Sequence, residues 1–112
     1  MSDAEKLKRL AQVSHLMMDA RMLALEKAAR ARQNSLDRLA ELDLPVECVD
    51  LSPLRAAEVA MRYALWADQR RSEINTVLAG QTVAWVEARQ EAARAFGRNQ
   101  IVQKLATKGK VT

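Results

Sequence analysis

The side chains that most often carry out chemical reactions are nearly missing from this chain, which has one histidine and one cysteine. His15 lies in a long helical pattern, and Cys48 lies in the break between two such patterns. A zinc site needs three or four ligands at suitable spacing, and a Ser-His-Asp site needs a pocket. The phosphate-binding run GxxxxGK[ST] and the dinucleotide-binding run GxGxxG are absent from the sequence. We therefore expect no enzyme activity, no catalytic residues, no bound metal and no cofactor.

Residues that bind other proteins are better candidates for function. One group lies within a short stretch: Trp66 with Arg62 and Arg70 one turn to either side, and the aromatic Tyr63 close by. Tryptophan, tyrosine and arginine dominate the binding energy of protein interfaces. Trp66 lies about 100° around a helix from Leu65, and we expect Met61 and Leu65 to point inward while Trp66 faces a partner. The alternative is an arginine packed over the indole at the edge of a helix seam.

The two prolines, Pro45 and Pro53, bracket one short break between long helical patterns. Leu44 precedes a proline and is pushed out of the helical conformation, so the first helix should end near Leu42 or Asp43. Ser52 and Pro53 are typical of an N-cap and a first helical residue. We predict a single domain over 1–112, an all-α antiparallel two-helix hairpin of the coiled-coil type. It has a helix over about 3–43, a turn over 44–52 and a longer helix over about 53–108.

Apolar and small residues recur every three or four positions in both patterns, as one face of a helix requires. In the first helix the expected inward residues are Leu7, Ala11, Ser14, Met18, Met22, Leu25, Ala29, Leu36 and Ala40. In the second they are Leu54, Ala57, Met61, Leu65, Ile74, Val77, Gln81, Trp85, Ala88, Ala92, Phe96, Val102 and Leu105. Gly80 and Gly97 interrupt the second pattern without ending it, at a cost of up to about 1 kcal/mol each.

The charges predict a basic end of the hairpin. If Asp43 and Pro53 face each other, residue i lies opposite roughly residue 96 − i, and everything after Arg94 extends past the first helix. No acidic residue follows Glu91, so the cations of this extension should have no partner within the chain. The expected partner-binding cations are Arg94, Arg98 and Lys104. Acidic residues gather near the turn instead: Asp37, Glu41, Asp43, Glu47 and Asp50.

Composition places the protein in a class. Alanine, leucine, arginine, glutamate and glutamine dominate, as in long helices and coiled coils. Two helices bury only one seam, so we expect a protein partner or a second copy in the cell. The first ten residues lack an apolar signal segment, no run has the roughly 18 uncharged residues of a membrane span, and a lone cysteine suits a reducing compartment. A cytoplasmic protein without membrane insertion is expected, with Cys48 structurally neutral.

The second pattern contains the run AWVEARQEAARAFGR from Ala84 to Arg98, followed by Lys104 and Leu105. Together with the two long helices, this run looks like the FliJ family of bacterial flagellum biogenesis and its injectisome counterparts, the stalk proteins of type III secretion. The resemblance implies that Lys6 to Val13 and Arg89 to Leu105 enter and stimulate the hexameric export ATPase. It also implies that the surface around Tyr63, Trp66, Arg70 and Arg71 contacts the export gate or chaperones.

Two other classes stay open. A generic coiled-coil adaptor would bury its spare apolar surface as a homodimer, with two hairpins forming a four-helix bundle. A basic helix that binds nucleic acid would need its charge concentrated and interleaved with stacking aromatics, whereas most of this chain has mixed charge. We therefore expect protein partners rather than nucleic acid. The oligomeric state, monomer or homodimer, is not determined by the sequence.

Overall fold

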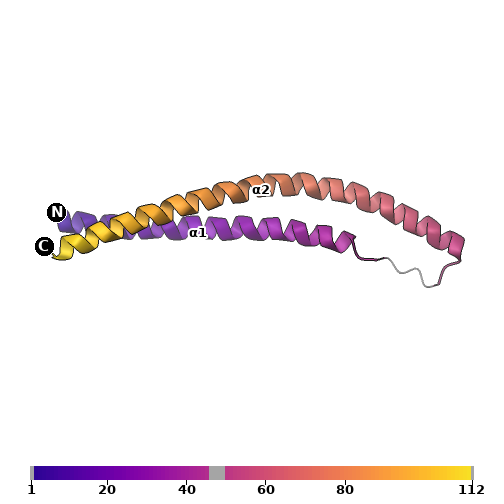
Figure 1. The fold of residues 1–112 in the computed structure, drawn as a ribbon, viewed down its shortest axis with the longest axis horizontal. Helices are drawn as coiled ribbons and strands as arrows, with labels where there is room; N and C mark the ends of the chain where they lie inside the picture. Colours follow the sequence, from indigo (N-terminus) through magenta and orange to yellow (C-terminus); the bar gives the residue numbers. More distant parts are fainter. Residues whose placement is uncertain (1, 46–49, 112) are drawn as a thin grey trace. The chain divides into compact units, whose positions relative to one another are not determined.

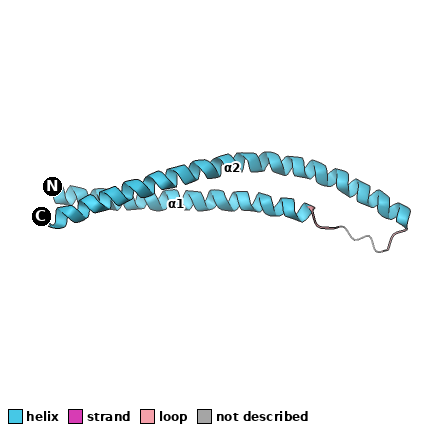
Figure 2. Ribbon diagram, in the orientation of Figure 1, coloured by secondary structure: helices cyan, strands magenta, loops and turns pink. Residues whose placement is uncertain are grey.

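The computed structural model describes residues 2–45 and 50–111 of the chain. Helix α1 runs from Asp3 to Leu42, and helix α2 runs from Pro53 to Val111 (Figure 1). The described residues contain these two helices and no strand (Figure 2). The predicted all-α hairpin with a longer second helix is therefore confirmed. Glu47 and Cys48, about which the sequence made predictions, lie outside the described residues.

Local signals set three of the helix ends as elementary chemistry predicts. The Ser52 hydroxyl oxygen accepts a hydrogen bond from the Arg55 backbone N–H at 3.4 Å, so it caps α2 ahead of Pro53. The Ser2 hydroxyl oxygen accepts one from the Glu5 N–H at 3.3 Å and caps α1 in the same way. At the far end of α1, the Asp43 N–H turns back to the Ala40 carbonyl oxygen at 3.1 Å, which tightens the last turn.

The chain divides into two compact units, and each unit contains a segment of both helices. The terminal unit comprises residues 1–30 and 83–112, and the turn unit comprises residues 31–82. In the terminal unit, the start of α1 lies beside the end of α2 (Figure 1). Within each unit, contacts move forward along α1 as they move backward along α2, so the two segments are antiparallel.

The turn unit is centred on a small apolar cluster. Leu42, Ala67 and Ile74 are buried, and Leu39 and Tyr63 pack against them. Ala67 is only 1% exposed, because a methyl group allows the helices to approach closely there. Polar contacts continue the seam: Ser35 donates a hydrogen bond from its hydroxyl to the Gln81 side-chain oxygen, and Arg32 Nε donates to Thr82 Oγ1 at 3.3 Å.

The terminal unit has a seam of small and polar residues. Ala11, Ser14, Ala92, Ala95 and Asn99 are buried in it. On α2 the inward positions recur at alternating steps of four and three: Trp85, Ala88, Ala92, Ala95, Asn99, Val102 and Ala106. This is the heptad spacing of a coiled coil.

Several predicted inward positions are wrong. Phe96 is 51% exposed because Ala95 and Asn99 take the inward positions on either side of it, and Leu105 is 49% exposed because Val102 and Ala106 do so there. Val77 is also exposed, since Ile74 fills the seam at that level. In α1, Met22 and Ala40 are exposed as well. The inward face of each helix is thus offset slightly from the apolar stripe, toward smaller side chains.

The register of the two helices differs from the predicted one. Gln103 contacts Ala11, Asn99 contacts Met18 and Arg71 contacts Leu42, so contacting residue numbers add up to between 113 and 117 rather than 96. The predicted register placed Asp43 opposite Pro53 and so assumed a tight turn. Ten residues from Asp43 to Ser52 can span up to about 33 Å, so the loop does not force the two helix ends to lie at the same level. The seam therefore decides the register.

The extension past the end of the partner helix consequently belongs to the start of α2, not to its end. Leu42 closes α1 at the level of Arg71, and no residue of α1 lies opposite residues 53–62. This stretch of ten residues is about 15 Å long. Leu54 and Met61, which the sequence placed inward, are 73% and 67% exposed for this reason. Leu65, also placed inward, is 67% exposed because Tyr63 and Ala67 take the inward positions beside it.

Candidate partner-binding surfaces

The aromatic surface lies in the turn unit and is formed by both helices. The Tyr63 and Trp66 rings tilt against each other with centroids 5.6 Å apart and an angle of 41° between their planes. They line a groove of about 490 Å³ together with Arg38, Glu41, Leu42, Arg70 and Ile74. Trp66 is 55% exposed, as the sequence predicted, although Met61 and Leu65 are not the residues that fill the inward positions. Tyr63 and Ala67 do so.

The two arginines of this stretch have different environments. Arg70 forms an ion pair of 3.0 Å with Glu73, one turn further along α2, and it lines the aromatic groove. Arg71 reaches across to α1: its Nη2 donates to the Leu42 carbonyl oxygen at 3.2 Å and lies 3.0 Å from the Asp43 carboxylate. Its Nη1 contacts Asp68 at 2.8 Å. Arg71 therefore closes the C-terminal end of α1, where unpaired carbonyls favour a cation.

The basic surface lies in the terminal unit, but its geometry differs from the predicted one. Arg94, Arg98 and Lys104 do not extend past α1, because Asn99 and Gln103 between them contact it. Arg94 has a partner within the chain, the Glu91 carboxylate at 2.7 Å. All three cations are exposed. Arg98 also lines a groove between the two helices.

Charge is divided unequally between the two units. The terminal unit has twelve lysines and arginines against six aspartates and glutamates, a net charge of +6. The turn unit has six against eight, a net charge of −2. Cationic side chains come from both chain ends: Lys6, Lys8 and Arg9 on α1, and Arg98, Lys104 and Lys108 on α2. A surface of this kind attracts an acidic partner, more strongly at low ionic strength.

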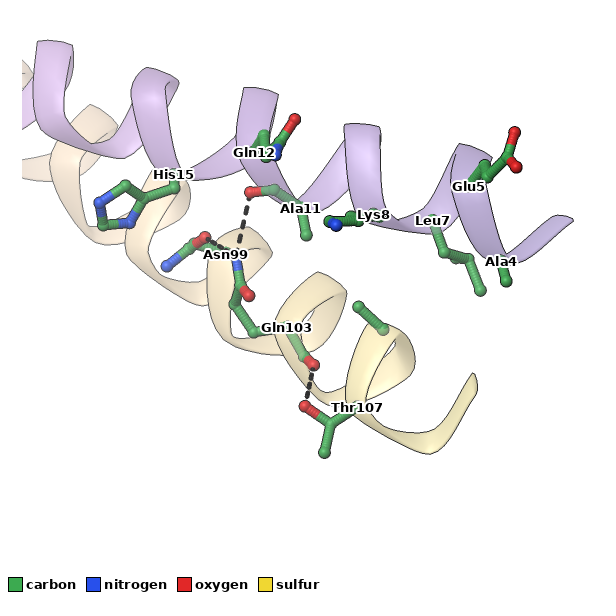
Figure 3. A pocket seen from close by; sticks show the side chains of 11 residues that line it. Ala4, Glu5, Leu7, Lys8, Ala11, Gln12, His15, Asn99, Gln103 and Thr107 are labelled. Atoms are coloured by element: carbon green, nitrogen blue, oxygen red, sulfur yellow. Dashed lines mark hydrogen bonds between the residues drawn. The ribbon is translucent and has the colours of Figure 1, made fainter. Parts of the chain in front are cut away.

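A polar network crosses the seam at this basic end (Figure 3). Gln103 Nε2 donates to the Ala11 backbone carbonyl oxygen at 3.0 Å and contacts the Asn99 side-chain oxygen at 3.1 Å. Asn99 Nδ2 points at the Met18 sulfur at 3.4 Å. Sequence reasoning missed Asn99 because it read Phe96 as inward. Continuing the four-three spacing from Trp85 to Ala106 would have placed it in the seam.

The network borders an open groove of about 550 Å³ between the helices, which Leu7, Lys8 and His15 also line (Figure 3). His15 is exposed on the rim, with its Nε2 3.4 Å from the Asp19 carboxylate one turn away. Among the described residues, no polar group of α2 contacts the side chain of His15 or Asp19. The described residues contain no group of three or more histidine, cysteine, aspartate or glutamate side chains placed to hold a metal ion.

In the described residues, neither helix has a segment long and apolar enough to cross a membrane. Comparison with protein-family models, curated proteins and solved structures gives no match for this chain.

Proposed function

We propose that this hairpin is a non-enzymatic stalk of the FliJ type, which inserts its terminal unit into an export ATPase ring and stimulates ATP hydrolysis. The observation that carries the proposal is the pairing of the two chain ends. Gln103 contacts Ala11, so both ends form one two-helix segment with a net charge of +6. A paired and charged helical segment is stiffer than the single extended helix that the sequence predicted, and stiffness suits a shaft inside a ring.

The aromatic surface of the turn unit supplies the second contact of such a stalk. Trp66 is half exposed beside Arg70 and above a buried cluster, so a partner can cover the indole without disturbing the seam. Exposed tryptophans beside arginines are typical of interface hot spots. We assign this groove to the export gate or a chaperone, whereas the basic surface is assigned to the ATPase.

The test is the rate of ATP hydrolysis by a purified export ATPase with and without the full chain. Under this proposal the chain increases the rate, and raising the salt concentration reduces the increase because the contact is charged. A matched experiment adds the same concentration of an unrelated helical hairpin of similar net charge. If the ATPase does not respond to the chain, or responds equally to the control, the stalk proposal fails.

A homodimerising adaptor is the second candidate, and the exposed start of α2 favours it. Leu54, Met61 and Leu65 form an apolar stripe that no part of α1 covers. Two such stripes packed antiparallel around residue 60 would place Glu58 of one copy near Arg62 of the other, so the contact is self-complementary in charge. Sedimentation equilibrium separates the candidates, since the stalk is expected to be a monomer and the adaptor a dimer.

A further inference from the structure

Helix α1 has more apolar surface in the terminal unit than its pairing with α2 covers. Leu10, Val13 and Met17 follow helical three-four spacing beside the seam, and they are 51%, 51% and 49% exposed. A two-stranded coiled coil needs apolar residues at only two of seven positions. A third apolar position in each heptad is typical of a helix that packs against two neighbours instead of one.

Helix α2 supplies the facing wall of a groove beside this stripe. Ala95 is buried and Val102 is half-buried, and both line the groove with Leu10, Val13 and Met17. The groove has a volume of about 210 Å³. Small-molecule sites usually measure about 300–1,000 Å³, so this one is too small for such a ligand. A shallow apolar groove between antiparallel helices suits the side chains of a third helix.

The rim of the groove is cationic. Arg21 on α1 and Arg98 on α2 line it, together with one acidic residue, Glu91. The Glu91 carboxylate lies 2.7 Å from the Arg94 guanidinium, so the one acidic group of the rim already has a cationic partner. A second copy of this chain packed groove to groove would bring its own Arg21 and Arg98 against the same cations. The rim therefore disfavours self-association and favours an acidic occupant.

We propose that this groove binds one amphipathic helix of a protein partner, with leucine, isoleucine or valine along its inner face and aspartate or glutamate on its flanks. The bound helix completes a three-helix bundle over Leu10 to Met17 of α1 and Ala95 to Val102 of α2. Its carboxylates then lie near Arg21 and Arg98. The inference deepens the proposed function, because it defines the chemistry of the segment that the basic surface recognises.

The test is direct binding of a synthetic probe to the full chain, measured by fluorescence anisotropy. The probe is a labelled peptide of three heptads with leucine at the two core positions and glutamate at the flanking positions. A twin peptide has lysine in place of every glutamate. We expect the acidic peptide to bind at least about tenfold more tightly than its twin at low salt, with a smaller difference at high salt.

Matched variants locate the site. Leu10→Gln removes groove surface, and Leu16→Gln removes a similarly exposed leucine that does not line the groove. Arg98→Glu reverses a rim charge, and Arg30→Glu reverses an exposed charge outside the groove. We expect the two groove variants to weaken binding of the acidic peptide by about fivefold or more and the two controls by less than about twofold. All four side chains are exposed, so circular dichroism should show unchanged helix content.

Several results would overturn the proposal. They are absence of binding of the acidic peptide, equal binding of the lysine twin, and equal loss in the groove variants and their controls. Dimerisation of the chain that Leu10→Gln abolishes would assign the groove to a second copy instead. None of these results depends on an ATPase, so the groove proposal and the stalk proposal can fail separately.

Discussion

Arg71 of α2 donates a hydrogen bond to the backbone carbonyl oxygen of Leu42, the last residue of α1, at 3.2 Å. The same guanidinium lies 3.0 Å from the Asp43 carboxylate and 2.8 Å from the Asp68 carboxylate. One side chain thus connects the end of α1 to the first third of α2. This contact also marks the level at which α1 stops and α2 continues alone toward Pro53.

Replacing Arg71 by alanine should destabilise the hairpin. The change removes a charged hydrogen bond to a helix end, and we expect the free energy of unfolding to fall by about 1 kcal/mol, since the side chain is partly exposed. Urea unfolding followed by circular dichroism measures the change. Arg70→Ala is the control, because Arg70 pairs only one turn along its own helix, and it should cost less than about 0.5 kcal/mol. Equal costs for the two variants would contradict a bridging role for Arg71.

Gly80→Ala should stabilise the protein. A Cβ atom added at Gly80 meets nothing within 4 Å, and no described glycine has a positive φ angle. Close helix approach therefore does not require this glycine. Alanine is the better helix former by up to about 1 kcal/mol, so the free energy of unfolding should rise by about that amount. A lower denaturation midpoint for Gly80→Ala would show that α2 needs flexibility at this point.

Asn99→Leu should raise thermal stability but weaken the specificity of helix pairing. Asn99 is only 8% exposed and holds a polar network in a seam that is otherwise formed mainly by small residues. A buried asparagine in a coiled coil lowers stability and selects one register and one oligomeric state. We expect a higher melting temperature together with mixed oligomers in sedimentation velocity. Gln100→Leu, at the neighbouring exposed position, should change neither the melting temperature nor the oligomeric state. If the Asn99→Leu variant is purely monomeric, Asn99 does not select the register or the oligomeric state.

Trp66→Ala should weaken partner capture with little effect on folding. The indole is 55% exposed and loses mainly its contact with the Tyr63 ring, so we expect a loss of stability of no more than about 1 kcal/mol. Thermal unfolding and binding of a purified chaperone or export-gate domain measure the two effects. Trp66→Phe should retain part of the binding. A stability loss of several kcal/mol would instead assign the indole to the core.

Charge reversal of the basic surface tests the stalk directly. Replacing Arg94, Arg98 and Lys104 together by glutamate should leave the hairpin folded, because all three side chains are exposed. Stimulation of the export ATPase should be lost, and association should slow most at low salt. The rate of ATP hydrolysis and the helix content are measured on the same samples. A folded triple variant that stimulates as well as the wild type would rule out this surface as the working contact.

The positions of the helices follow from local chemistry that a sequence displays directly. Ser52 and Pro53 favour the start of a helix by local chemistry alone. The serine oxygen accepts a hydrogen bond from a backbone N–H of the first turn, which has no partner within the helix, and proline has no backbone N–H that would need a partner. Leu44 before Pro45 stops α1 for a similar local reason. The two helices were predictable because each depends on spacing within one chain segment. Trp66 is exposed as predicted, although the residues expected to fill the inward positions beside it, Met61 and Leu65, are exposed as well.

The register and the inward faces depend on residues far apart in the chain, and the sequence determined neither. Ala67 and Ala95 take inward positions ahead of larger neighbours because close helix approach favours small side chains where the two helices cross. Asn99 and Gln103 find their partners only once that register is set. A ten-residue loop adds little energy to select one register over another. The tertiary structure alone therefore placed the basic end of α2 against α1 and left the start of α2 exposed, because the fit of the two helix surfaces outweighs the position of the turn.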